Sequence, residues 1–116
     1  MNRTNFILLT LSLLCLMSCN HSKKINPIQN QKIMITKDIT YIPEGVCSQQ
    51  MDISVVNDTI RLVKIYKGCA GNTQGVSRLV EGMQIDDAIT KLEGIICGDK
   101  TTSCPDQLSK ALKSMK

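Results

Sequence analysis

Residues 51–66 read MDISVVNDTIRLVKIY, and this stretch determines the fold that we expect for the chain. Its first half alternates apolar and polar residues, which is the two-residue period of a strand with one buried face. Asn57 and Asp58 tolerate positive φ and therefore suit a tight hairpin turn. Residues 60–66 supply the returning strand. The alternating apolar positions of the first half are Met51, Ile53 and Val55.

A further strand is predicted upstream of this hairpin, over residues 33–42. Apolar residues again alternate in it, and Pro43-Glu44-Gly45 ends it, because proline and glycine favour turns. The three strands follow one another with short connections, which is typical of an antiparallel meander. The alternating positions are Ile33, Ile35, Ile39 and Tyr41.

Three helices are predicted after the strands. The first is capped by Asn72 and ends near Gly82, and the second begins at Asp86 or Asp87 and closes at Gly94. Their apolar positions are Val76, Leu79, Val80 and Met83 in the first, and Ile85, Ala88, Ile89 and Leu92 in the second.

Pro105 fits the first position of the third helix, whereas Ser103 with Asp106 forms a capping box that places the start one residue earlier. Its apolar positions recur at helical spacing. They are Leu108, Ala111, Leu112 and Met115. The sequence thus predicts an α+β domain over residues 33–116, with about three antiparallel strands followed by three helices.

The N-terminal residues have a different character. Phe6 to Met17 is apolar apart from Thr10 and Ser12, and it follows a single positive charge, as in a secretory signal. Its end, Leu16-Met17-Ser18-Cys19, resembles the lipobox of bacterial lipoproteins. We therefore expect residues 1–18 to be a signal peptide, Cys19 to be lipidated, and residues 19–32 to be a polar tether. This predicts a protein anchored by lipid to a membrane of the bacterial cell envelope.

Charge and composition argue against a nucleic-acid partner. The chain carries 14 Lys and Arg against 10 Asp and Glu, and only 3% of its residues are aromatic. A nucleic-acid surface would need a basic stripe, and a surface for single strands would need aromatic platforms. The single histidine, His21, lies in the predicted tether, so no Ser–His–Asp set is expected in the folded part.

Four cysteines lie at the joints between predicted elements. They are Cys47, Cys69, Cys97 and Cys104. Cys69 and Cys104 stand at or just before predicted helix N-termini, where the helix dipole favours a thiolate. Four thiolates around tetrahedral zinc form a common structural site, but the two C-x-x-C pairs of a zinc ribbon are missing. The spacing alone leaves metal binding and disulfides equally open.

Residues 102–106 read TSCPD, which is the signature that names the TSCPD domain family. Other segments are similar to motifs of the same family, and the resemblance covers residues 41–113. The family includes small stand-alone four-cysteine proteins and a C-terminal module of class II, cobalamin-dependent ribonucleotide reductases. The similar segments are GVCS at 45–48, GCAGN at 68–72, LVEGM at 79–83 and CGD at 97–99.

The resemblance implies a metal-binding module, with zinc (Zn2+) held by the four cysteines and an iron–sulfur cluster less favoured. It also implies a link to ribonucleotide reductase, although 116 residues cannot hold the barrel of such an enzyme. We therefore expect no catalysis and an unidentified protein partner. One alternative is a cytoplasmic protein that is associated with class II ribonucleotide reductase and acts in deoxyribonucleotide synthesis. A second is a disulfide-stapled or thiol-redox envelope protein.

A weaker resemblance connects the chain with the scaffold proteins of iron–sulfur assembly. Cys47, Cys69 and Cys104 follow the order in which those scaffolds place their cysteines. In the scaffolds the Cys-Gly-Asp motif carries the first cysteine, whereas here it carries Cys97. The likeness therefore supports the α+β fold and a clustered site, but not a scaffold function.

Overall fold

The central hairpin forms as predicted. A computed structural model describes residues 32–116, in which β2 spans Ser48–Val56 and β3 spans Thr59–Lys67. Asn57 and Asp58 form the turn with φ of 49° and 61°. Positive φ at both central residues matches the right-handed twist of the two strands. The predictions for residues 1–18, for Cys19 and for the tether up to residue 31 lie outside the described residues.

β1 spans Thr36–Tyr41 and pairs with β2, so the antiparallel sheet has the order β1-β2-β3. The strand is shorter than the predicted range of residues 33–42. Thr36 is paired with Val56, the last residue of β2, so residues before Thr36 have no strand beside them. Ile33 is accordingly 83% exposed, and it contributes nothing to the core.

A β-bulge in β3 sets which side chains reach the core. Val55 is paired with Ile60 and Ser54 with Leu62, so the pairing passes over Arg61. Because one residue is skipped, Ile60 and Val63 are both buried although three positions separate them. The bulge thereby directs Leu62 to the opposite, open face.

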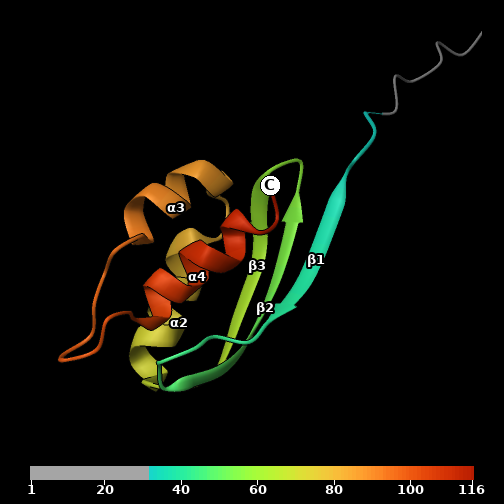
Figure 1. Ribbon diagram of the computed structural model, residues 1–116. Helices are drawn as coiled ribbons and strands as arrows, with labels where there is room; N and C mark the ends of the chain where they lie inside the picture. The colour runs from blue at the N-terminus through green and yellow to red at the C-terminus, as the bar shows by residue number, and fades with distance from the viewer. Residues whose placement is uncertain (1–31) are drawn as a thin grey trace, which may run out of the picture. The chain divides into compact units, whose positions relative to one another are not determined.

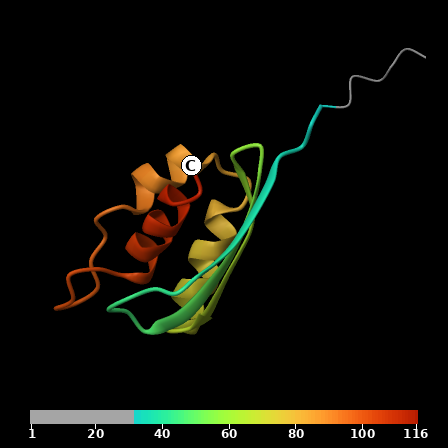
Figure 2. The same cartoon turned by 45° about the vertical axis from the view of Figure 1, so that its right-hand side comes forward.

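The helices cover one face of the sheet. α2 spans Ala70–Val80, α3 spans Ile85–Leu92 and α4 spans Cys104–Lys113. α2 and α4 lie against the sheet, and α3 packs on α4 on the far side from it (Figure 1). The view turned by 45° shows the sheet almost edge-on with all three helices on one side of it (Figure 2). The predicted α+β architecture is confirmed.

The first helix differs from the prediction in its start and in its buried face. Its N-cap is Cys69 rather than Asn72, and Leu79, one of its apolar positions, is 77% exposed and lies outside the core. Thr73 and Ser77 occupy the buried stripe instead. Their hydroxyls donate to backbone oxygens one turn earlier, and this hydrogen bonding allows small polar residues to be buried.

The other two helices follow their signals more closely. α3 begins at Ile85, with Asp86 and Asp87 in its first turn, and Gly94 follows it with φ of 78°. α4 has Ser103 as N-cap, and its hydroxyl oxygen accepts a hydrogen bond from the Asp106 N–H at 3.2 Å. The predicted apolar stripe of α4 is confirmed as core.

The core lies between the sheet and the helices. β2 and β3 contribute their inward side chains, and α2, α3 and α4 contribute theirs. None of the helices in the described part of the chain is long and apolar enough to cross a membrane. The buried apolar residues are Met51, Ile53, Val55, Ile60, Val63, Val80, Ile85, Ala88, Ile89, Leu108, Ala111, Leu112 and Met115.

Candidate metal centre

Four separate joints of the fold bring the four cysteines to one pocket. Cys47 precedes β2, Cys69 caps α2, Cys97 lies in the connection between α3 and α4, and Cys104 is the first residue of α4. All four line the same small pocket. The pocket is completed by Val46, Asn72, Lys100, Ser103 and Pro105.

A close backbone approach joins the joints that carry Cys47 and Cys69. Gly68 has φ of 87°, a left-handed conformation that glycine adopts without steric cost. A Cβ at this position would lie 3.3 Å from the backbone nitrogen of Ser48. Because glycine adopts this φ and avoids the tight contact, the end of β3 can lie directly beside the start of β2, which places the two cysteines at one edge.

A buried carboxylate holds the connection between α3 and α4. The Thr102 hydroxyl donates to Asp106 Oδ2 at 2.6 Å, and the Gly94 N–H donates to Asp106 Oδ1 at 2.8 Å. Lys110 forms an ion pair with the same carboxylate at 2.9 Å. These contacts, with that of Thr102 first, lower the pKa of Asp106 from 3.8 to about 2.

The same connection folds back on itself so that Cys97 approaches Cys104. The Ser103 hydroxyl donates to the Ile95 oxygen at 2.6 Å, and the Cys97 N–H donates to the Thr102 oxygen at 3.4 Å. The Lys100 N–H donates to the Cys97 oxygen at 3.1 Å. The residues around Cys104 in the TSCPD segment therefore hold the connection in place through hydrogen bonds, and we call this arrangement the brace. Cys104 itself lines the pocket.

Gln107 ties the loop of Cys47 to this brace. Its amide nitrogen donates to the Thr102 hydroxyl at 3.0 Å. Its amide oxygen accepts hydrogen bonds from the Tyr41 hydroxyl and from the Glu44 N–H, each at 3.1 Å. The side chain is buried, so this bridge is shielded from water and fixes the chain just before Cys47.

Two polar side chains contact the thiols directly. Lys100 Nζ donates to Cys47 Sγ at 3.2 Å, and Ser48 Oγ lies 3.2 Å from Cys104 Sγ, within hydrogen-bonding distance. The hydrogen bond to Cys47 and the negative charge of its thiolate raise the pKa of Lys100. The charges of Cys97 and Cys104 also raise the pKa of Lys100. The ammonium group of Lys100 therefore interacts with several cysteines of the cluster.

The cysteine side chains are accessible. Cys47, Cys69 and Cys97 are exposed and Cys104 is half-buried, and none of the four is in a disulfide in the described structure. Within residues 32–116, no three Cys, His, Asp or Glu side chains are placed together closely enough to hold a metal ion. The backbone thus gathers the four thiols around one pocket, and their sulfurs do not form a ready ligand group.

Comparison with known protein families gives a match over most of the chain. The family model described as the TSCPD domain matches residues 24–116, which includes the whole folded part and all four cysteines. No curated protein and no solved structure gives a significant match.

Proposed function

Since the chain belongs to the TSCPD domain family, we propose that it is a binding module whose four cysteines hold one zinc ion. The observation that carries this proposal is the convergence of four cysteines from four separate joints on one pocket. Cysteines scattered for packing alone would lie along apolar faces of the elements. These four instead lie where chain segments that are distant in sequence meet.

The chemistry of the donor set fits a soft divalent metal. Thiolate is the ligand form of cysteine, and helix N-termini and nearby cations favour it. Cys69 caps α2, Cys104 opens α4, and the Lys100 ammonium group contacts Cys47. Zinc with four thiolates is tetrahedral and has no open position. When bound, it would join the four joints of the fold, and this is a structural contribution.

Binding requires the sulfurs to move toward a common centre, because the described side chains do not form a ready ligand group. A change of χ1 rotamer moves a cysteine sulfur by about 3 Å without moving the backbone. Three of the four side chains are exposed and can rotate into the pocket. The positions of the joints are already set by Gly68, Asp106 and Gln107, so only short side chains rearrange.

The module is proposed to be non-catalytic and anchored by lipid on Cys19, which lies outside the described residues. The lipobox-like residues 16–19 support the anchor. Residues 20–32 then form a tether that presents the domain to an unidentified protein partner at the envelope.

The metal content of the full-length chain, purified without chelators, tests this proposal. We expect about one zinc per chain in the unchanged protein, and a loss of zinc when Cys47, Cys69, Cys97 or Cys104 is changed to Ser. Cys19→Ser is the matched control, because it makes the same substitution outside the pocket at a residue that belongs to the mature chain. Unchanged protein without zinc, or four variants that retain it, would contradict the proposal.

A further inference from the structure

The outer edge of β1 is open. Ile35 exchanges two hydrogen bonds with Asn57 at 2.9 and 3.0 Å, so its backbone groups point toward β2. Because bonded and non-bonded pairs alternate along an antiparallel ladder, Thr36, Asp38 and Thr40 turn their N–H and C=O groups the other way. No other backbone group within residues 32–116 pairs with them. An open row of this kind is a template for another strand.

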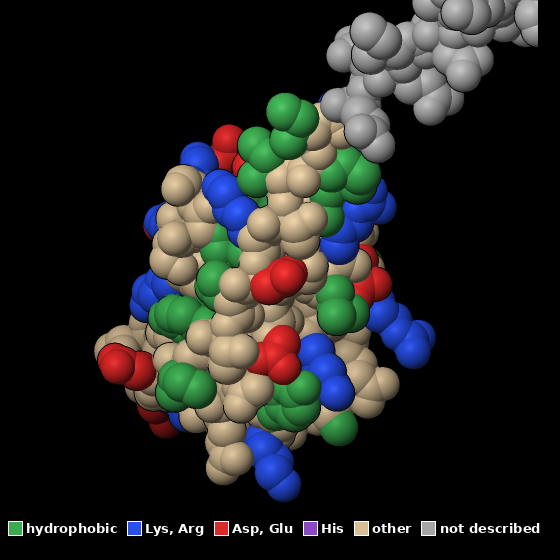
Figure 3. All heavy atoms as spheres, turned by 90° about the vertical axis from the view of Figure 1, so that its right-hand side faces the viewer, with side chains coloured by type: hydrophobic (Ala, Val, Ile, Leu, Met, Phe, Trp, Pro, Cys, Tyr) green, Lys and Arg blue, Asp and Glu red, His purple; other side chains and the backbone are tan. Residues whose placement is uncertain are grey.

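Exposed apolar side chains lie at both ends of β1. Met34 and Ile35, before the strand, are 62% and 58% exposed, and Ile42, after it, is 63% exposed. Seen from the β1 side, hydrophobic side chains gather at the end of the surface where the described chain begins (Figure 3). An antiparallel partner of the same sequence would place the start of one β1 beside the end of the other. The apolar residues of both copies would then cover each other.

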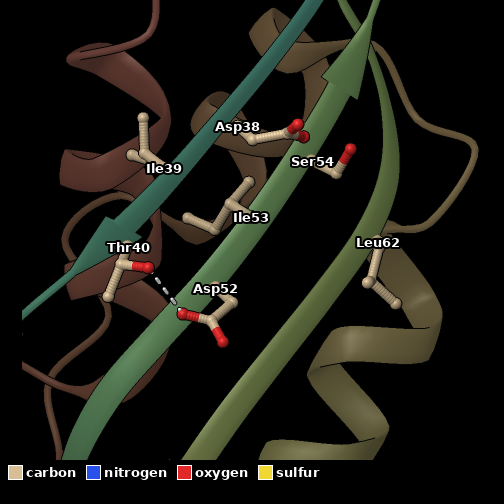
Figure 4. A pocket seen from close by; sticks show the side chains of 7 residues that line it. All are labelled: Asp38, Ile39, Thr40, Asp52, Ile53, Ser54 and Leu62. Atoms are coloured by element: carbon tan, nitrogen blue, oxygen red, sulfur yellow. Dashed lines mark hydrogen bonds between the residues drawn. The ribbon is translucent and has the colours of Figure 1, made fainter.

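We propose that two copies of this chain pair antiparallel through the outer edges of β1, forming one six-stranded sheet. Opposed residues in such a pair must share a face of the sheet. Asp38 and Thr40 lie on the open face, together with Asp52, to which Thr40 donates a hydrogen bond at 2.9 Å (Figure 4). Ile39 lies on the helix side, where it packs against the core.

The charges of the strand select the register. Two registers overlap β1 with itself almost completely, one centred on Asp38 and one on Ile39. Centring on Asp38 would oppose two carboxylates, which is destabilising. Centring on Ile39 instead opposes Asp38 to Thr40 and Lys37 to Tyr41.

The register centred on Ile39 also bonds the outward groups along β1. It opposes Thr36 to Ile42 and Asp38 to Thr40, so the outward backbone groups of these four residues are bonded in each copy. Pro43 does not obstruct it, because by the same alternation position 43 faces β2. The proposal is independent of metal binding, since β1 carries none of the four cysteines.

Sedimentation equilibrium of the full-length chain in density-matched detergent tests the dimer. Asp38→Pro removes an outward N–H and leaves the bonds to β2 intact, because an edge strand tolerates proline on its open side. We expect the unchanged chain and Asp38→Asn to be dimeric, and Asp38→Pro to raise the dissociation constant about a hundredfold. A monomeric unchanged chain, or an Asp38→Pro dimer of equal strength, would overturn the proposal. Circular dichroism confirms that each variant is folded.

Oxidative crosslinking tests the register. Residues at position 39 of the two copies would form a non-bonded pair with Cα atoms about 4.5 Å apart, which is within the range for a disulfide. Ile39→Cys should therefore give more covalent dimer than Asp38→Cys, with the unchanged chain oxidised in parallel to show what the native cysteines contribute. More crosslinking through position 38 than through position 39 would overturn the proposed register.

Discussion

The Thr102 hydroxyl donates to Asp106 Oδ2 at 2.6 Å, and both residues are buried. This pair stands at the start and the end of the TSCPD segment, with Cys104 between them. The segment is therefore a structural brace as much as a ligand motif. Its polar residues form hydrogen bonds within the α3–α4 connection and hold it in place, while Cys104 lines the pocket together with Ser103 and Pro105.

Acid should loosen this brace. The pKa of Asp106 is lowered to about 2 in the folded chain, so its contribution to stability is complete above about pH 4 and is lost as the pH falls toward 2. Asp106→Asn should destabilise the protein at neutral pH by an amount on the order of 1–2 kcal/mol. It should also make the free energy of unfolding fall less steeply as the pH is lowered from about 4 to about 2. Urea unfolding between neutral pH and pH 2 measures both effects.

Asp99→Asn is the control for that experiment. Asp99 is an exposed carboxylate of the same connection and makes no hydrogen bond among the described residues. If the free energy of unfolding of Asp106→Asn falls in acid as steeply as that of the unchanged chain, another group causes the acid sensitivity.

Truncation of Leu112 should lower the free energy of unfolding more than truncation of most other core residues. It is fully buried on α4, where the helix faces the sheet. Leu112→Ala should lower the free energy of unfolding by about 2–5 kcal/mol, whereas Leu79→Ala, at a site that is 77% exposed, should change it by less than about 0.5 kcal/mol. Chemical denaturation measures the two costs, and equal costs would mean that the core is assigned incorrectly.

Lys100 should tune the proposed metal site. Its ammonium group donates to Cys47 Sγ and is shared by the cysteine cluster. Lys100→Met should weaken zinc binding a few-fold, because an exposed cation stabilises a neighbouring thiolate only modestly. Competition with a chromophoric chelator measures the affinity, and Lys100→Arg should restore it. Tighter binding in Lys100→Met would refute the role of this cation.

Cys19 should anchor the protein. Cys19→Ala is expected to move the chain from the membrane fraction to the soluble fraction, while Cys15→Ala, the same change within the leader, leaves it in membranes. Fractionation and immunoblotting of cells report the distribution. Recovery of Cys19→Ala in membranes at the level of the unchanged chain would exclude a lipid anchor at this residue.

The elements that could be predicted from the sequence are those with local signals. Asn57-Asp58 fixed the hairpin, and Ser103, Pro105 and the Leu108–Leu112 spacing fixed α4. The buried face of α2 could not be predicted in the same way. Thr73 and Ser77 look like surface residues in sequence, and their burial depends on hydrogen bonds to their own helix. The apolar residue Leu79 of the same helix is exposed instead.

The candidate site likewise contains residues that could be predicted from the sequence and residues that could not. Its four cysteines could be selected from the sequence, because they stand at joints and match the motifs of a family. Lys100, Ser48 and Gln107 could not, since each is defined by a partner far along the chain. Lys100 contacts a residue 53 positions away, Ser48 one 56 positions away and Gln107 one 63 positions away. Contacts between residues so far apart leave no periodic pattern in the sequence, so they become visible only in the folded structure.

X-ray absorption spectroscopy at the zinc edge, on the full-length chain purified with its native metal, tests the central claim most directly. A site formed by Cys47, Cys69, Cys97 and Cys104 predicts a single shell of four sulfurs at about 2.3 Å. Three sulfurs with a nitrogen or oxygen ligand would contradict the four-cysteine site, and protein that carries no zinc would contradict metal binding itself.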